Sequence, residues 1–123
     1  MKIVVDGMGG DNAPVEILKG CALAVREYGV EIIITGDEAQ IKKAAEENSV
    51  DMTGITVEAA DGIITMEDNP LSLRTEKKNS SLGKAFQILK KGEADALVGA
   101  GNSGALLVGA TIIAGRIKGV NRP

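Results

Sequence analysis

Short apolar runs alternate with amphipathic stretches along this chain of 123 residues. Four of the runs, mostly rich in β-branched residues, predict strands at 2–6, 31–35, 55–59 and 94–100. Two of them are short continuous apolar runs, which is typical of strands that are buried on both faces of a sheet.

The spacing of the other apolar residues predicts four helices. The first lies between Pro14 and Gly29, which suit a helix start and the position just past a helix end. Asp37 opens the second helix and Gly92 ends the third. The fourth covers residues 103–117 and is apolar nearly all round, so we expect another part of the protein to bury it. The apolar positions of the first three are Leu18, Cys21, Ala22, Val25, Ile41, Ala44, Ala45, Leu82, Ala85, Phe86 and Leu89.

This alternation of strands and helices predicts an α/β fold, with αβα layers around a largely parallel sheet. Ligands of such folds bind beyond the carboxyl ends of the strands. Glycine and small polar residues gather in the loops expected there, as in "DGMGGDNAP" and "GAGNSG". The segment 61–79 has no clear periodicity, and loops of that length are often functional or mobile.

Composition restricts the chemistry that the chain can perform. It contains no histidine, which excludes Ser-His-Asp and Cys-His catalysis and a histidine metal site within it. The net charge of −3 argues against nucleic acid as a partner. The longest apolar stretch, residues 104–115, is too short to span a bilayer, and the one cysteine, Cys21, suits a helix core. We expect a soluble, cytoplasmic chain.

Two predicted helix starts could bind an anion. In "RTEKKNSSLGKA", Arg74, Lys77 and Lys78 precede Asn79, Ser80 and Ser81, so that cations and hydroxyls lie near free N–H groups. In "GAGNSGAL", Asn102 and Ser103 open the fourth helix in the same way. If both starts follow neighbouring strands, they form one pocket.

Each of these motifs also has a purely structural interpretation. The loop "DGMGGDN" reads equally well as a strand-to-helix turn, and the two serine- and asparagine-rich starts read as ordinary capped helices. A magnesium site is a further alternative, but its candidate ligands share no common spacing. They are Asp6, Asp11, Asp61 and Asp68.

Taken together, "DGMGGDNAP", "KKNSSL", "AGNSGAL" and "GRIKGVNRP" resemble the phosphate acyltransferases of bacterial phospholipid synthesis, the PlsX family. The resemblance covers the chain from end to end. Members are much longer, so residues 1–123 are expected to be the N-terminal portion of a single catalytic domain. The family fold resembles those of phosphotransacetylases and isopropylmalate dehydrogenases.

The resemblance implies transfer of a fatty acyl group from acyl carrier protein to inorganic phosphate, with no cofactor and no metal. It implies catalytic roles for Asp11, Lys78 and Asn102. The phosphate-binding residues expected are Ser80, Ser81, Ser103 and Gly104. Asp6, Gly9 and Gly10 would supply a loop whose backbone approaches the ligand closely.

The resemblance also implies partners. We expect a cytoplasmic homodimer, with peripheral association at the inner membrane face as an open alternative. A membrane-bound glycerol-3-phosphate acyltransferase would consume the product. The candidates for docking the acidic carrier are Lys84, Lys90, Lys91, Arg116 and Lys118. Two alternatives remain open: a non-catalytic phosphate- or nucleotide-binding module, and a portion that contributes only folding and dimer contacts.

Overall fold

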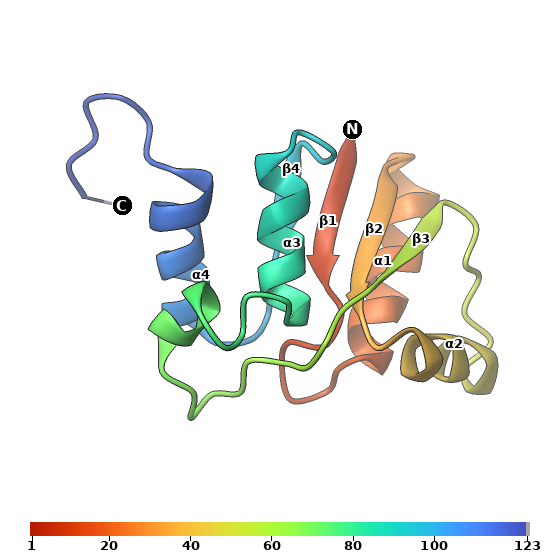
Figure 1. Ribbon diagram of the computed structural model, residues 1–123. Coiled ribbons are helices and arrows are strands. Elements are labelled where there is room, and N and C mark those ends of the chain that lie inside the picture. Colours follow the sequence, from red (N-terminus) through yellow and green to blue (C-terminus); the bar gives the residue numbers. More distant parts are fainter. Residues whose placement is uncertain (123) are drawn as a thin grey trace.

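The computed structural model describes residues 1–122 and has helices on both faces of one parallel sheet, with α3 on one side and α1 on the other (Figure 1). The sheet has four strands in the order β3-β2-β1-β4. The strands are β1 (Lys2–Asp6), β2 (Glu31–Gly36), β3 (Ile55–Ala59) and β4 (Ala96–Val98). The helical elements are α1 (Val15–Tyr28), α2 (Glu38–Glu47), the 3-10 helix η1 (Pro70–Arg74), α3 (Ser81–Lys90), α4 (Ser103–Gly109) and the π-helical turn η2 (Ala110–Ala114). The expected α/β class with a parallel sheet is confirmed.

Successive residues of β1 face opposite layers of the core. Val5 belongs to the cluster that contains Leu18 of α1. Val4 belongs to the cluster that contains Ala85 and Ile88 of α3. Because side chains alternate across a strand, a central strand covered by helices on both faces must be apolar at consecutive positions.

Most of the expected element boundaries are confirmed. β1 and β3 have the predicted limits, and the carboxylate of Asp37 caps α2 by accepting the N–H of Gln40 at 3.0 Å. Gly29 ends α1 with φ of 65°, a left-handed conformation that favours glycine. The strand predicted at 94–100 is shorter, because β4 pairs only with residues 3–5 of β1.

The fourth helix differs in form from the prediction. It begins at Ser103 as expected, continues as the π-helical turn η2 and ends before Gly115. It packs against η1 and α3 rather than on the sheet, beyond the β4 edge (Figure 1). Its buried residues are Ala105 and Gly109, so burial of the rest by another part of the protein stays a prediction. Among residues 1–122, no helix is long and apolar enough to cross a bilayer.

The contact between α4 and α3 depends on the absence of a side chain at Gly109. A Cβ atom at this position would overlap the ring of Phe86. That ring is only 2% exposed and lies in the cluster with Leu73 and Ala105, so it has no space into which to move.

We therefore expect Gly109→Ala to lower the free energy of unfolding by about 1–3 kcal/mol, the usual cost of overfilling a packed core. Gly20→Ala in α1 is the matched control, because a Cβ atom there meets nothing within 4 Å. It should raise stability by about 0.5–1 kcal/mol, since alanine is the better helix former. Urea unfolding measures both changes. Equal stability of the Gly109 variant and the unmodified protein would show that α4 is not held against Phe86.

Candidate functional site

Two loops meet at the carboxyl edge of the sheet, one after β1 and one after β4. A Cβ atom on Gly9 would lie 3.1 Å from the backbone nitrogen of Gly101, and one on Gly10 would lie 3.1 Å from the carbonyl oxygen of Ala100. Gly10 also has φ of 102°, which favours glycine. The glycines therefore let two parts of the chain approach each other. Close approach of a ligand to the same backbone stays a prediction.

The carboxylate of Asp6 lies beneath this loop contact and is buried. It accepts the N–H of Met8 at 3.1 Å, and its Oδ2 would lie 2.5 Å from a Cβ atom on Gly9. Burial raises the pKa of Asp6, while the Ser81 hydroxyl and the N–H groups of Met8 and Gly9 act in the opposite direction. Asp6 thus fixes the loop from below, and its side chain is not presented to solvent.

The start of α3 is closed by the protein itself. Ser80 is fully buried and caps the helix, with its hydroxyl accepting the N–H of Gly83 at 3.2 Å. The N–H of Ser81 donates to the carbonyl of Gly62 at 3.0 Å, and the hydroxyl of Thr35 donates to the carbonyl of Ser81 at 2.7 Å. Phosphate contact by Ser80 and Ser81 stays a prediction, and it requires the Gly62 segment to move.

One polar atom at this buried helix start has no partner. The Ser81 hydroxyl lies near enough to Asp6 to influence its pKa, yet it makes no hydrogen bond of good geometry within residues 1–122. Buried hydroxyls in folded proteins are almost always paired. Ser81 is therefore the residue of this start whose side chain retains unused bonding capacity.

The side chain of Asn102 is saturated and buried. Its Oδ1 accepts the N–H of Ala105 at 3.0 Å and so caps α4. Its Nδ2 donates to the carbonyl oxygens of Thr65 at 3.0 Å and Asp68 at 3.2 Å. Because both amide hydrogens are used, a catalytic role for this amide stays a prediction and requires release of the 65–68 loop.

The 61–79 segment is tied down by several polar contacts. The Asp68 carboxylate accepts the N–H of Thr65 at 2.7 Å, and this bond holds the pKa of Asp68 below its usual range. The ammonium of Lys77 lies 3.9 Å from the same carboxylate and donates to the carbonyl of Ile63 at 3.0 Å. The absence of periodicity in this segment therefore reflects irregular but bonded structure.

Asp11 lies on the rim of a groove of about 210 Å³ between the β1 loop, the β4 loop and residues 63–67. Its charged lining residues are Asp11 and Glu67, and Met8, Ile63, Ile64 and Met66 supply apolar surface. Lys78, Ser80 and Ser103 do not line it. The groove thus suits an apolar group, whereas its two carboxylates would repel a phosphate.

The start of α4 remains open, in contrast to that of α3. Ser103 is exposed, and the N–H groups of Ser103 and Gly104 donate to no acceptor among residues 1–122. These are the donors that a helix leaves without internal partners. Lys78 is also exposed, but it lines a groove together with Arg74, and this groove does not include Ser103 or Gly104.

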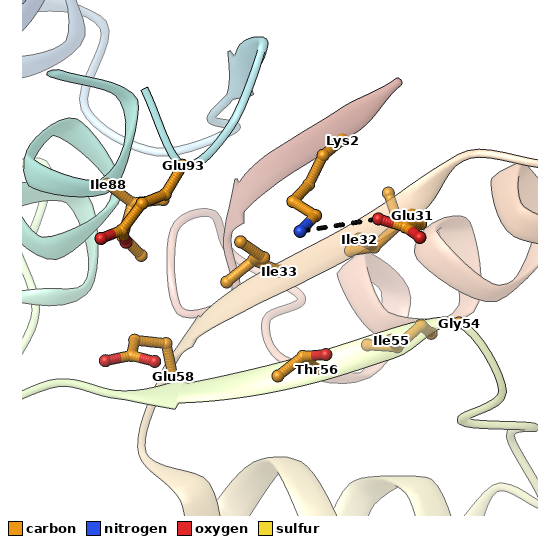
Figure 2. Close-up of a pocket in the computed structure, with 10 residues that line it drawn as sticks. All are labelled: Lys2, Glu31, Ile32, Ile33, Gly54, Ile55, Thr56, Glu58, Ile88 and Glu93. Atoms are coloured by element: carbon orange, nitrogen blue, oxygen red, sulfur yellow. Dashed lines mark ion pairs between the residues drawn. The ribbon is translucent and has the colours of Figure 1, made fainter. Parts of the chain in front are cut away.

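A further open groove, of about 410 Å³, lies over β2 and β3 on the same face of the sheet as α3, whose Ile88 lines it (Figure 2). Lys2 and Glu31 form an ion pair across it at 3.6 Å, and Thr56 and Glu58 project into it from β3. The sequence pattern did not predict this groove, and it does not include the residues of the carboxyl-edge loops.

Within the described part of the chain, residues 1–122, neither a metal cluster nor a reactive thiol adds to the site. Among residues 1–122, no group of three or more acidic or cysteine side chains gathers closely enough to hold a metal ion. Cys21 is buried on the inner face of α1, as expected, and burial raises the pKa of its thiol to about 11.

Sequence comparison supplies the family. The family model described as "Fatty acid synthesis protein" matches residues 1–123. The chain belongs to this family. The relatives carry a more specific name, phosphate acyltransferase.

Among these relatives, a phosphate acyltransferase of Clostridium novyi (strain NT) is 48% identical over 124 residues, and one of Clostridioides difficile (strain 630) is 45% identical over 123 residues. A phosphate acyltransferase of Acetivibrio thermocellus is 47% identical over 124 residues. Each comparison covers 100% of this chain but only 36–37% of the relative. The chain therefore spans little more than a third of the length of the relatives that it matches.

Sequence reasoning missed the residues that organise the loops of this family member. These contacts use the backbone carbonyls of Gly62 and Thr65 and the buried hydroxyl of Thr35. The spacing of the three residues in the sequence does not predict them. One signal was present. Thr65 and Asp68 form a Thr-x-x-Asp pattern, in which the later carboxylate reaches back to the earlier N–H.

The anchoring role of Asn102 gives a direct prediction. Asn102→Asp keeps an oxygen for the Ala105 N–H but loses both donors and places a charge beside two carbonyl oxygens. We expect a loss of about 1–3 kcal/mol in the free energy of unfolding, as for a broken buried hydrogen-bond pair. Hydrogen exchange at residues 63–68 should quicken.

Asn69→Asp provides the matched control. The Oδ1 of Asn69 accepts the N–H of Leu71 at 2.9 Å at an exposed helix start, and its Nδ2 donates to nothing among residues 1–122. The same chemical change should leave both measurements nearly unaltered there. If the two variants behave alike, the Nδ2 bonds of Asn102 do not hold the loop.

Proposed function

We propose that this chain is the N-terminal portion of a phosphate acyltransferase, which transfers a fatty acyl group from acyl carrier protein to inorganic phosphate. The observation that carries the proposal is the 45–48% identity to relatives of that name over the whole chain. Because the chain spans only 36–37% of those relatives, the activity is proposed for the whole protein.

The reaction suits a chain that contains no histidine. A phosphate oxygen attacks the carbonyl carbon of the thioester, so that a C–O bond forms and the C–S bond breaks. The carrier leaves as a thiolate and takes up a proton. Phosphate near neutral pH is already an anion, and no base is needed to deprotonate it first. The protein's task is to hold phosphate against the carbonyl and to stabilise the oxyanion that develops.

The open start of α4 supports a phosphate-binding role for Ser103 and Gly104, because their N–H groups are unused and the Ser103 hydroxyl is exposed. We assign Lys78 as the cation that approaches the bound phosphate. The side chain of Asn102 positions this helix start by capping it.

The carboxyl-edge groove supports a place for the acyl end of the thioester. Met8 and Met66 give it apolar surface, and it is bounded by the glycine loop that Asp6 fixes. Asp11 lies on its rim, where its carboxylate would keep phosphate out of the groove and on the side of Ser103.

Our proposal for the cellular setting follows from the same activity. We infer a cytoplasmic homodimer whose acyl phosphate is consumed by a membrane-bound glycerol-3-phosphate acyltransferase. Leu107 supports an assembly, since this apolar side chain of α4 is 52% exposed.

The proposal is tested in the whole protein with acyl carrier protein thioester and phosphate, with hydroxylamine to trap the acyl phosphate. Hydroxamate should form, and EDTA should leave its rate unchanged. Lys78→Met removes one charge but keeps most of the aliphatic stem. A charge-assisted hydrogen bond contributes about 1.5–3 kcal/mol, so kcat/KM for phosphate should fall about tenfold to a hundredfold.

Lys91→Met is the matched control, because Lys91 is exposed, follows α3 directly and makes no ion pair within residues 1–122. It should retain kcat/KM for phosphate within about twofold, as expected for an exposed charge that makes no specific contact. Saturable phosphate binding without hydroxamate would indicate a non-catalytic module. An unchanged phosphate dependence in Lys78→Met would remove Lys78 from the site.

A further inference from the structure

A groove of about 320 Å³ between η1, α3 and η2 combines three cations with an apolar floor. Arg74, Lys78 and Lys90 supply the cations, and Leu73, Ile112 and Ile113 supply the apolar surface. None of the acidic side chains among the described residues lines it. We call it the basic groove.

The basic groove lies in the positive half of an acidic chain. Residues 1–60 contain 5 basic and 11 acidic side chains, a net charge of −6, whereas residues 61–123 contain 9 basic and 6 acidic ones, a net charge of +3. Apart from Arg26, every basic side chain that lacks an ion pair within residues 1–122 lies at or beyond Arg74. The three cations of the groove are therefore available to an outside partner.

The length of the groove indicates the kind of partner. Gly83 and Lys90 both line it and lie on the same helix, α3. Seven residues of helix rise about 10 Å, which is too far for one phosphate group to contact cations at both ends. An acidic helix matches this groove, because several carboxylates along one side of the helix would pair with the three cations. An apolar residue between the carboxylates would contact the apolar floor.

We propose that the basic groove docks an acidic helical surface of the acyl carrier protein; this inference rests on the proposed function. The groove begins beside the start of α3, where a Cβ atom on Gly83 would overlap the carbonyl of Lys78. That helix start lies against Asp6 at the carboxyl edge. A carrier bound along α3 would thus have one end near the edge at which the thioester must react.

This groove changes the set of docking residues expected from the sequence. Of Lys84, Lys90, Lys91, Arg116 and Lys118, only Lys90 lines it. Arg74 and Lys78 join Lys90 because η1 and the following loop fold back against α3, a contact that charge counting along the sequence does not reveal.

The test uses the whole protein with Arg74→Glu and Lys90→Glu combined, and fluorescently labelled acyl carrier protein as the probe. Both side chains are exposed, so the fold should persist, as melting temperature verifies. Reversing two charges in the groove should raise Kd for the carrier about tenfold or more. The loss of kcat/KM with carrier-linked thioester should exceed the loss with a carrier-free acyl thioester. If the double variant does not fold, Arg74→Gln with Lys90→Gln replaces it.

Lys91→Glu is the matched control, since Lys91 adjoins Lys90 in the sequence but does not line the groove. Its Kd for the carrier should stay within about twofold of the unmodified protein. An unchanged Kd in the double variant, or an equal rise in the control, overturns the proposal.

Carrier binding is measured without turnover. A protein that binds the carrier through these residues but forms no acyl phosphate would refute the proposed function and leave the docking surface standing.

Discussion

The close contact between the loops that follow β1 and β4 organises the carboxyl edge of the sheet. Parallel neighbours end at the same edge of the sheet, so their loops must pass each other there, and glycine at positions 9 and 101 lets the two backbones do so. Asp6 holds the first loop from below through the N–H of Met8. The second loop leads directly into α4, whose cap, Asn102, in turn holds the 65–68 segment over the edge. A single backbone contact thereby orders three separate parts of the chain.

This arrangement separates the chemical capacities that an acyl transfer to phosphate would need. Within residues 1–122, N–H donors without an acceptor lie at the start of α4, apolar surface lies in the groove beside Asp11, and cations without an ion pair line the basic groove. The two helix starts, which look alike in sequence, differ because Gly62 and Thr35 occupy the polar groups of the α3 start. Burial, and not the type of residue, decides which start can receive an anion.

The fold was largely predictable from the sequence, whereas the site was predictable only in part. Apolar periodicity and helix-capping residues such as Asp37 and Gly29 act locally, so they predicted the limits of most helices and strands. The pairing of the Ser81 N–H and the double donation by Asn102 depend on residues 19 to 37 positions away in the chain, and no local pattern encodes such contacts. The grouping of Arg74 with Lys90 has the same origin, because it exists only once η1 has folded against α3.

The central claim is that the open start of α4 receives the phosphate, and amide hydrogen exchange tests it most directly. Exchange in the whole protein would be compared in phosphate and in chloride of equal ionic strength. The account predicts slower exchange in phosphate at residues 103–105, the start of α4, with the protection saturating as the phosphate concentration rises. Protection confined to residues 81–90 of α3, with the start of α4 unchanged, would place the phosphate at α3 and contradict the account.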